Sequence, residues 1–254
     1  MVKRRKGISL WVGKIWAGWY FFIFGFIFLL MYPLFRFHLA NKSRYRRANK
    51  LRVIWARILF ILTGIRERIS GAENLPVETP VIFCPNHTSY LDIPAVTLAL
   101  KKYHIRFLAK AELGNIPLFG IFFRTIDIAV NRESTADSVR SLQQASEVLH
   151  EGDSLIIFPE ATIHKDAPQL HRFKNGAFRL AIENQIPIVP ITFADNWRLL
   201  DVDHGFSGTP GQARIFIHPP ISTKNLTLND VDSLKEKTFR IIHEQLIQSG
   251  ILQK

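Results

Sequence analysis

The chain has 254 residues, of which 47% are hydrophobic, and its formal net charge is +12. This length suits one sizeable globular domain with an appendage. The charge by itself is compatible with nucleic acid, an anionic membrane surface or a phosphorylated substrate. Residues 1–70 hold 15 Lys and Arg against one acidic residue, whereas residues 71–254 hold 18 against 20. The basic charge belongs to the appendage, which argues against nucleic acid as a partner.

An uncharged run of 21 residues, 15–35, lies within this appendage. At about 1.5 Å per helical residue, the run is long enough to cross a bilayer core of roughly 30 Å. It is strongly aromatic and Arg36 follows it directly, so we expect a retained segment rather than a cleaved signal peptide. Basic residues flank both ends, which leaves two topologies open: a single span, or a segment that enters one leaflet and returns after a break at Gly25 or Pro33.

Residues 51–62 place apolar side chains at the spacing of one helical face: Leu51, Ile54, Trp55, Ile58, Leu59 and Leu62. Such a helix lies either at the membrane interface or on the core of the globular domain. Its position beside the hydrophobic run and its arginines favour the interface. We therefore predict a membrane anchor over residues 1–70 and a globular domain over residues 71–254.

In the globular part, short apolar runs alternate with helical patterns. The runs are 80–83, 105–108, 126–130, 155–158, 188–193 and 214–217, and the helical stretches are 95–101, 136–149, 176–183 and 232–248. This alternation predicts an α/β fold with a single, largely parallel sheet flanked by helices. Ligands of such sheets gather where strands end, and polar clusters follow the first, third and fourth runs.

The first of these clusters, Asn86 to Asp92, contains the elements of a catalytic base. The histidine side chain in general titrates near pH 6.5, close to operating pH, which suits a base, and a carboxylate partner such as Asp92 would fix the tautomer of His87. A spacing of five needs a turn or a helix start between the two side chains, which Thr88 and Ser89 favour. No Gly-x-Ser-x-Gly elbow is present, so the hydroxyl of the substrate would take the place of a catalytic serine.

The other clusters contain groups suited to an acceptor. Arg132 follows the third run, and Glu160 and Thr162 follow the fourth. Lys165, Arg172 and Lys174 form a basic stretch beside them, which we interpret as a contact for an anion or a head group. His164 and His171 lack the spacing and companion ligands of a recognised metal site, so we predict no metal.

Four blocks in this order resemble the glycerolipid acyltransferase family, and most closely its bacterial 1-acyl-sn-glycerol-3-phosphate acyltransferases. The first is Asn86-His87-x4-Asp92, and the second runs from Lys110-x-Glu112-Leu113 through Pro117-x-Phe119-Gly120 to Arg132. The third is Phe158-Pro159-Glu160-Ala161-Thr162, followed by Phe173-Lys174-Asn175-Gly176-Ala177, and the fourth is the Ile-Pro-Ile-Val-Pro run at 186–190. The likeness covers residues 75–195.

The resemblance implies acyl transfer from acyl-CoA or acyl carrier protein to a lysophospholipid, without a cofactor, on the cytoplasmic face of a bacterial inner membrane. Membrane lipids and the lysophospholipid acceptor would be its partners. His87 would be the general base and Asp92 would orient it. Substrate contacts are expected from Asn86, Lys110, Arg132, Glu160 and Thr162.

Two departures from the family pattern concern the acceptor. Ala161 stands where the family has Gly, and Ile163 where it has an Arg that can bind phosphate in a bidentate manner. Lys165, Arg172 or Lys174 would then supply the missing cation, or the acceptor is a lyso-amino-acid lipid such as lyso-ornithine or lyso-glycine lipid. A non-catalytic membrane lipid-binding module is the alternative of another class, and the presence of both His87 and Asp92 favours the enzyme.

Overall fold

The computed structural model describes residues 8–78, 80–131, 135–202 and 205–253. These residues form a seven-stranded sheet in the order β1-β9-β6-β2-β5-β3-β4, and a two-stranded ribbon of β7 and β8. β2 to β6 are parallel to one another, whereas β9 is antiparallel to β6 and parallel to β1. The predicted largely parallel sheet is thus confirmed. The strands are β1 Ile65–Ser70, β2 Ile82–Pro85, β3 Ile105–Lys110, β4 Ile128–Val130, β5 Ser154–Ile157, β6 Ile188–Phe193, β7 Leu200–Asp201, β8 Ser207–Gly208 and β9 Gly211–Ile217.

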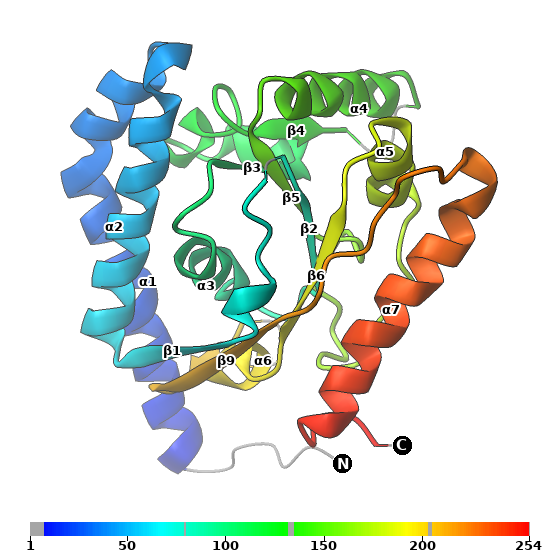
Figure 1. The fold of residues 1–254 in the computed structure, drawn as a ribbon. Coiled ribbons are helices and arrows are strands. Elements are labelled where there is room, and N and C mark those ends of the chain that lie inside the picture. Colours follow the sequence, from blue (N-terminus) through cyan, green and yellow to red (C-terminus); the bar gives the residue numbers. More distant parts are fainter. Residues whose placement is uncertain (1–7, 79, 132–134, 203–204, 254) are drawn as a thin grey trace.

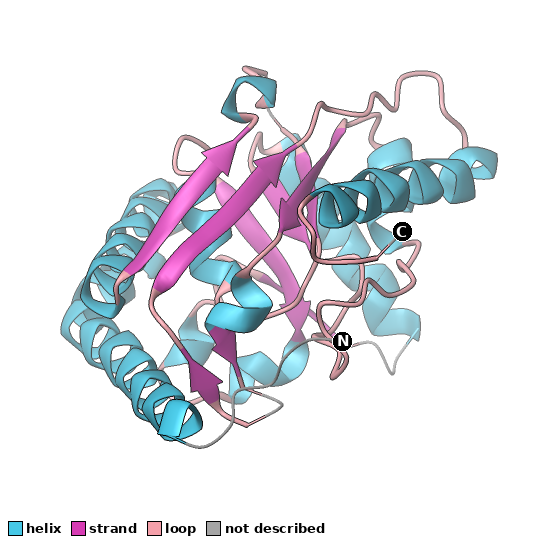
Figure 2. Ribbon diagram, turned by 90° about the horizontal axis from the view of Figure 1, so that it is seen from below, coloured by secondary structure: helices cyan, strands magenta, loops and turns pink. Residues whose placement is uncertain are grey.

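Helices cover both faces of the sheet. α1, α2 and α3 lie on one face and α4, α5 and α7 on the other, and both layers are visible in Figures 1 and 2. Neighbouring strand residues point to opposite faces, so Phe83 packs in the first layer and Ile82 in the second. The helices are α1 Ile8–Leu39, α2 Tyr45–Thr63, α3 Asp92–Ala99, α4 Thr135–His150, α5 Gly176–Glu183, α6 Asn196–Leu199 and α7 Val231–Gln248, with short 3-10 turns at Lys42–Arg44, Ala72–Asn74, Ala111–Asn115, Phe119–Ile121 and Leu228–Asp230.

The edge strand β1 was not predicted. It lies within residues 1–70, yet it pairs with β9 in parallel from Ile65 opposite Gly211 to Ser70 opposite Phe216. Its exposed and covered residues alternate, with Arg66 and Arg68 exposed. Charged side chains of this kind suit the solvent-facing edge of a sheet. The assignment of residues 1–70 as a membrane anchor remains a prediction.

α1 passes through Gly25 and Pro33 without a break, so neither residue divides the hydrophobic run. Leu10–Leu39 is, within the described ranges, the one helical stretch long and apolar enough to cross a membrane. α1 lies beside α2, and the Trp55 indole of α2 donates to the Phe24 carbonyl of α1 at 3.2 Å. Large apolar side chains remain exposed along α1: Trp11, Val12, Ile15, Trp19, Phe22, Phe26, Leu29, Leu30, Leu34 and Phe37.

α2 contacts the core of the globular part through one face. Trp55 and Leu59 of the predicted apolar stripe are buried, whereas Ile54 and Leu62 are exposed. Arg52, which the helical pattern placed away from the stripe, is buried and pairs with Asp127 at the start of β4, with Nη2 2.5 Å from Oδ2. This ion pair joins α2 directly to the sheet.

Candidate active site

Polar side chains gather where β2, β5 and β6 end. These three strands are adjacent and parallel, with β2 in the middle, so their carboxyl ends open at the same edge. His87 follows β2, Glu160 follows β5 and Asn196 follows β6. The loop after β4 starts further away, because β5 and β3 separate β4 from β2. Arg132 in that loop lies outside the described residues.

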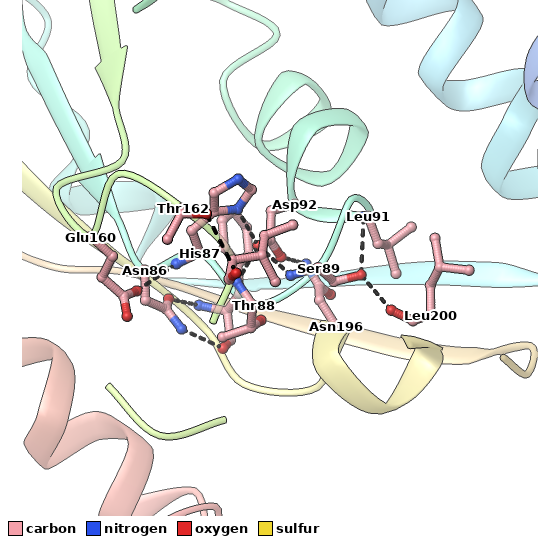
Figure 3. A network of polar contacts seen from close by, with 12 residues as sticks. Asn86, His87, Thr88, Ser89, Leu91, Asp92, Glu160, Thr162, Asn196 and Leu200 are labelled. Atoms are coloured by element: carbon pink, nitrogen blue, oxygen red, sulfur yellow. Dashed lines mark hydrogen bonds and ion pairs between the residues drawn. The ribbon is translucent and has the colours of Figure 1, made fainter. Parts of the chain in front are cut away.

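The His87 and Asp92 side chains meet across a tight turn (Figure 3). His87 Nδ1 lies 3.0 Å from Asp92 Oδ2. The Asp92 backbone N–H donates to the Ser89 carbonyl at 3.0 Å, and α3 begins at Asp92. This is the turn and helix start that a spacing of five requires, and the helix N-terminus also favours a carboxylate.

Asp92 is completely buried, and its carboxylate is held from several sides. The backbone N–H groups of Thr88 and Ser89 donate to Oδ2 at 2.7 and 3.0 Å. The Asn196 side chain donates to Oδ1 through Nδ2 at 2.7 Å. Both carboxylate oxygens therefore have donors, and the orientation of the group toward His87 is fixed.

The His87 ring lies on the Phe158 ring, with centroids 4.0 Å apart and an interplanar angle of 26°. Its side chain is 17% exposed. Within the part of the chain that the structure describes, Nε2 has no hydrogen-bond partner. With its proton on Nδ1 toward Asp92, the imidazole presents Nε2 as an acceptor, which is the form a general base requires.

Glu160 links the loop that contains His87 to the loop that contains His171. Its Oε1 accepts the backbone N–H of His87 at 2.8 Å, and its Oε2 accepts that of His171 at 2.9 Å. Burial raises the pKa of Glu160 to about 7, and the two backbone bonds oppose this effect. The next residue, Ala161, has φ +69°, the left-handed conformation that glycine adopts easily. The substitution of Ala for the family's Gly therefore leaves this backbone turn in place.

Asn86 lies deeper than the sequence suggested. Its Nδ2 donates to the Phe193 carbonyl at 3.1 Å, and its Oδ1 accepts the Phe193 N–H at 2.7 Å. The side chain is fully buried. In this conformation Asn86 joins the ends of β2 and β6, and both polar atoms of its side chain are bonded to the backbone of Phe193.

The remaining predicted contacts lie at the surface of the same region. Thr162 is half-buried, and the cations Lys110, Lys165, Arg172 and Lys174 are exposed. Lys110 ends β3, next to β5, and the Lys174 backbone N–H donates to the Pro159 carbonyl at 2.8 Å. His164 and His171 stack with centroids 3.7 Å apart, and His171 Nε2 lies 2.6 Å from Asp166 Oδ1. The absence of a metal stays a prediction.

Sequence reasoning missed Asn196 and the stacking role of Phe158. Asn196 stands 104 residues after Asp92, beyond the four sequence blocks that resemble the family. Its bond to Asp92 depends on the adjacency of β2 and β6. Phe158 was part of a quoted block, but an aromatic residue at the end of a buried run gives no local signal of stacking on a histidine.

Comparisons with known proteins agree with this architecture. A family model described as Acyltransferase matches residues 66–194. A 1-acyl-sn-glycerol-3-phosphate acyltransferase of Chlamydomonas reinhardtii is 31% identical over 237 residues, which cover 89% of this chain and 70% of that protein. A chloroplastic protein of the same name from Brassica napus is 32% identical over 183 residues, 70% of this chain and 52% of that protein. The chain thus spans about half the length of the Brassica relative.

The fold has a counterpart among solved structures. The crystal structure of the 1-acyl-sn-glycerophosphate acyltransferase from Thermotoga maritima superposes with a TM-score of 0.75. The match covers 92% of this chain and 97% of that one at 22% sequence identity. At this identity the likeness establishes the shared fold.

Proposed function

The chain belongs to the acyltransferase family, and on that premise we propose that it transfers a fatty acyl group to the free hydroxyl of 1-acyl-sn-glycerol 3-phosphate, making phosphatidic acid. Acyl-CoA or acyl carrier protein is the donor. The observation that carries this proposal is the His87-Asp92 pair, with Nδ1 on the buried carboxylate and Nε2 unpaired among the described residues.

The proposed reaction needs one proton carrier. Nε2 of His87 accepts the hydroxyl proton as the acceptor oxygen attacks the thioester carbonyl carbon. The new C–O bond forms, the C–S bond breaks, and the proton on Nε2 passes to the leaving thiolate. The products are an ester and a free thiol, and His87 returns to its neutral form. Asp92 fixes the tautomer and stabilises the transient imidazolium.

Recognition of the phosphate is assigned to the exposed cations beside the site. The side chains of Lys165, Arg172 and Lys174 form no hydrogen bond or ion pair with the described residues, so their charge can meet an anionic head group. Lys235 lowers the pKa of the Asp232 carboxyl, and Arg172, which also lies near Asp232, adds to this effect. Lys110 and Arg132 complete the proposed set, with Thr162 as a polar contact. Ile163 contributes no donor, and this observation favours a second candidate acceptor, a lyso-amino-acid lipid such as lyso-ornithine or lyso-glycine lipid.

The exposed apolar side of α1 supports a location at a membrane, where both the lipid acceptor and its product reside. Ile54, Ile61 and Leu62 of α2 extend the apolar surface. The basic residues around 42–50 suit anionic head groups. We place the enzyme at the cytoplasmic face of a bacterial inner membrane.

A panel of acceptors tests the assignment. Purified full-length protein would be given one acyl-CoA, or acyl carrier protein charged with the same chain, together with 1-acyl-sn-glycerol 3-phosphate, lyso-ornithine lipid or lyso-glycine lipid. Phosphatidic acid is the expected product. Turnover confined to the amino-acid lipids would replace the phosphate acceptor by the second candidate, and binding of lipid without turnover of any acceptor would favour the non-catalytic module.

A further inference from the structure

The segment after β6 contacts the His87-Asp92 turn at two points. The Asn196 amide donates to Asp92 Oδ1 at 2.7 Å, and the Ser89 hydroxyl donates to the Leu200 carbonyl at 2.7 Å. Ser89 in turn accepts the Leu91 backbone N–H at 3.1 Å. We call α6, β7, Phe206 and β8 together the bracing segment. It holds the turn from the side opposite Glu160.

The start of the bracing segment is itself fixed to the sheet. Asp195 is buried and accepts two bonds from Arg214 of β9, at 2.5 Å from Nε and 3.0 Å from Nη2. Arg198 of α6 adds a third contact, with Nη2 2.6 Å from Oδ1. The backbone that precedes Asn196 is therefore fixed, and the Asn196 amide is buried against Asp92.

The far end of the bracing segment rests on α1. The Phe206 ring stacks on Phe21 of α1, with centroids 5.6 Å apart at 16°. Gly208 lies against Trp16 so closely that a Cβ there would be 2.4 Å from the ring. Trp16 is held in turn, because its indole N–H donates to the Thr63 carbonyl of α2 at 3.1 Å. A continuous set of contacts thus runs from α1 to the Asp92 carboxylate.

The buried amide of Asn196 indicates why an asparagine stands there. Its Oδ1 has no hydrogen-bond partner in the described part of the chain, and a buried unpaired carbonyl is unfavourable. An apolar side chain of similar size would avoid that cost. The compensating interaction is the bond from Nδ2 to a charged carboxylate, which ranks among the stronger hydrogen bonds in proteins.

We infer that Asn196 is a positioning residue for Asp92, and that α1 sets its place through the bracing segment. The hydrophobic helix would then support the active site as well as attach the protein to the membrane. This inference rests on the proposed role of His87 and Asp92 as base and orienting carboxylate.

Substitution of Asn196 separates positioning from folding. Asn196→Leu keeps the branch at Cγ, is larger than Asn, and removes the donor to Asp92. We expect kcat to fall at least tenfold, the scale of a lost hydrogen bond to a charged group, while KM for acceptor and donor changes less than twofold and the variant still unfolds in one cooperative transition. Asn196→Ala is the second variant. Asn74→Ala removes a comparable amide-to-carbonyl bond, to Ile217, far from the site and should leave kcat unchanged.

A glycine pair tests the contribution of α1. A Cβ at position 208 would lie 2.4 Å from the Trp16 ring and 2.6 Å from the Leu199 carbonyl oxygen, so Gly208→Ala must shift β8 relative to Trp16 of α1 and to the end of α6. It should lower kcat in the same way as the Asn196 variants. Gly18→Ala adds the same methyl group within α1, where no atom lies within 4 Å of the new Cβ, and is the matched control. Full activity of Gly208→Ala would remove α1 from the inference.

A spectroscopic readout keeps this test independent of the substrate. The Nδ1–H proton of His87 would be observed by NMR in full-length protein labelled with ¹⁵N-histidine, and assigned by its loss in His87→Gln. Asn196→Leu and Gly208→Ala should abolish or broaden this signal through faster exchange with water, while Gly18→Ala and Asn74→Ala preserve it. An unchanged signal in Asn196→Leu, or its absence from the wild type, would overturn the inference. A wild type that shows these signal changes but transfers no acyl group would contradict the proposed function alone.

Discussion

One carboxylate oxygen of Glu160 accepts the backbone N–H of His87 at 2.8 Å, while the other accepts that of His171. The loop after β5 therefore holds the backbone of the proposed base, and the same carboxylate anchors the segment that bears the basic side chains. Glu160 is 3% exposed, and this burial raises its pKa to about 7. Its charge state changes near neutral pH, where the enzyme is expected to work.

This shift predicts a pH-dependent contribution to stability. The folded protein binds the Glu160 proton more tightly than the unfolded chain, whose carboxyl titrates at about 4.5. The contribution is therefore fully present below pH 4.5 and is lost as the pH rises through about 7, with a size on the order of 3 kcal/mol. Glu160→Gln removes the titration. The unfolding free energy of the wild type should fall relative to this variant between those pH values, and equal pH slopes would contradict the assignment.

Ala161 predicts a stabilising substitution. A left-handed backbone costs an L-residue about 1–2 kcal/mol, and Gly avoids this at an entropic cost of roughly 0.5–1 kcal/mol. Ala161→Gly should therefore raise the unfolding free energy by about 0.5–1 kcal/mol in chemical denaturation. Ala181→Gly, in right-handed α5, should instead destabilise the protein. A loss of stability in Ala161→Gly would show that the methyl group forms contacts worth more than the backbone strain.

Because the buried ion pair of Arg52 and Asp127 joins α2 to the sheet, we expect α2 and the sheet to unfold together. Removing one partner of a buried ion pair leaves an uncompensated charge, so Arg52→Met should lower the unfolding free energy by about 3–5 kcal/mol. Arg57 on the same helix is half-exposed, and its Nη2 lies 3.6 Å from Glu67 Oε1. Arg57→Met should therefore change the unfolding free energy by less than about 1 kcal/mol. Adding Asp127→Asn to Arg52→Met should recover part of the loss. Equal effects at Arg52 and Arg57 would mean that α2 is held by apolar packing alone.

We predict that Asp92→Asn lowers turnover without weakening the binding of either substrate. The amide keeps the shape of the carboxylate but favours the wrong histidine tautomer and does not stabilise the imidazolium. We expect kcat to fall by at least about 100-fold, with KM for both substrates nearly unchanged, in steady-state assays of phosphatidic acid formation. A variant with near wild-type kcat would leave Asp92 as a structural cap of α3.

The elements with clear periodicity were predictable from the sequence. The runs around β2, β3, β5 and β6 and the helices α4, α5 and α7 agree with the structure to within a few residues. β1 was missed because an edge strand needs only one covered side, and Arg66, Glu67 and Arg68 hide the apolar pattern. Arg52 was placed with the polar residues of its helix because its partner, Asp127, lies 75 residues later.

Only some contacts of the candidate site were predictable from the sequence. The meeting of His87 with Asp92 followed from a local turn, and the approach of Glu160 was expected because loops at the carboxyl ends of parallel strands lie at one edge of the sheet. The bonds that Asn196 and Asn86 form depend on the order of strands in the sheet, which the sequence does not show. The left-handed Ala161 was also unforeseen, because residues with a Cβ rarely adopt this backbone conformation.

The most direct test of the central claim is the rate of phosphatidic acid formation from 1-acyl-sn-glycerol 3-phosphate and acyl-CoA by the purified full-length protein and by His87→Ala. We predict turnover by the wild type and a kcat at least about 100-fold lower in the variant, while sedimentation with lipid vesicles is equal for both. Near wild-type turnover by His87→Ala would contradict its role as the base. Absence of turnover by the wild type with either acyl donor would contradict the proposed activity itself.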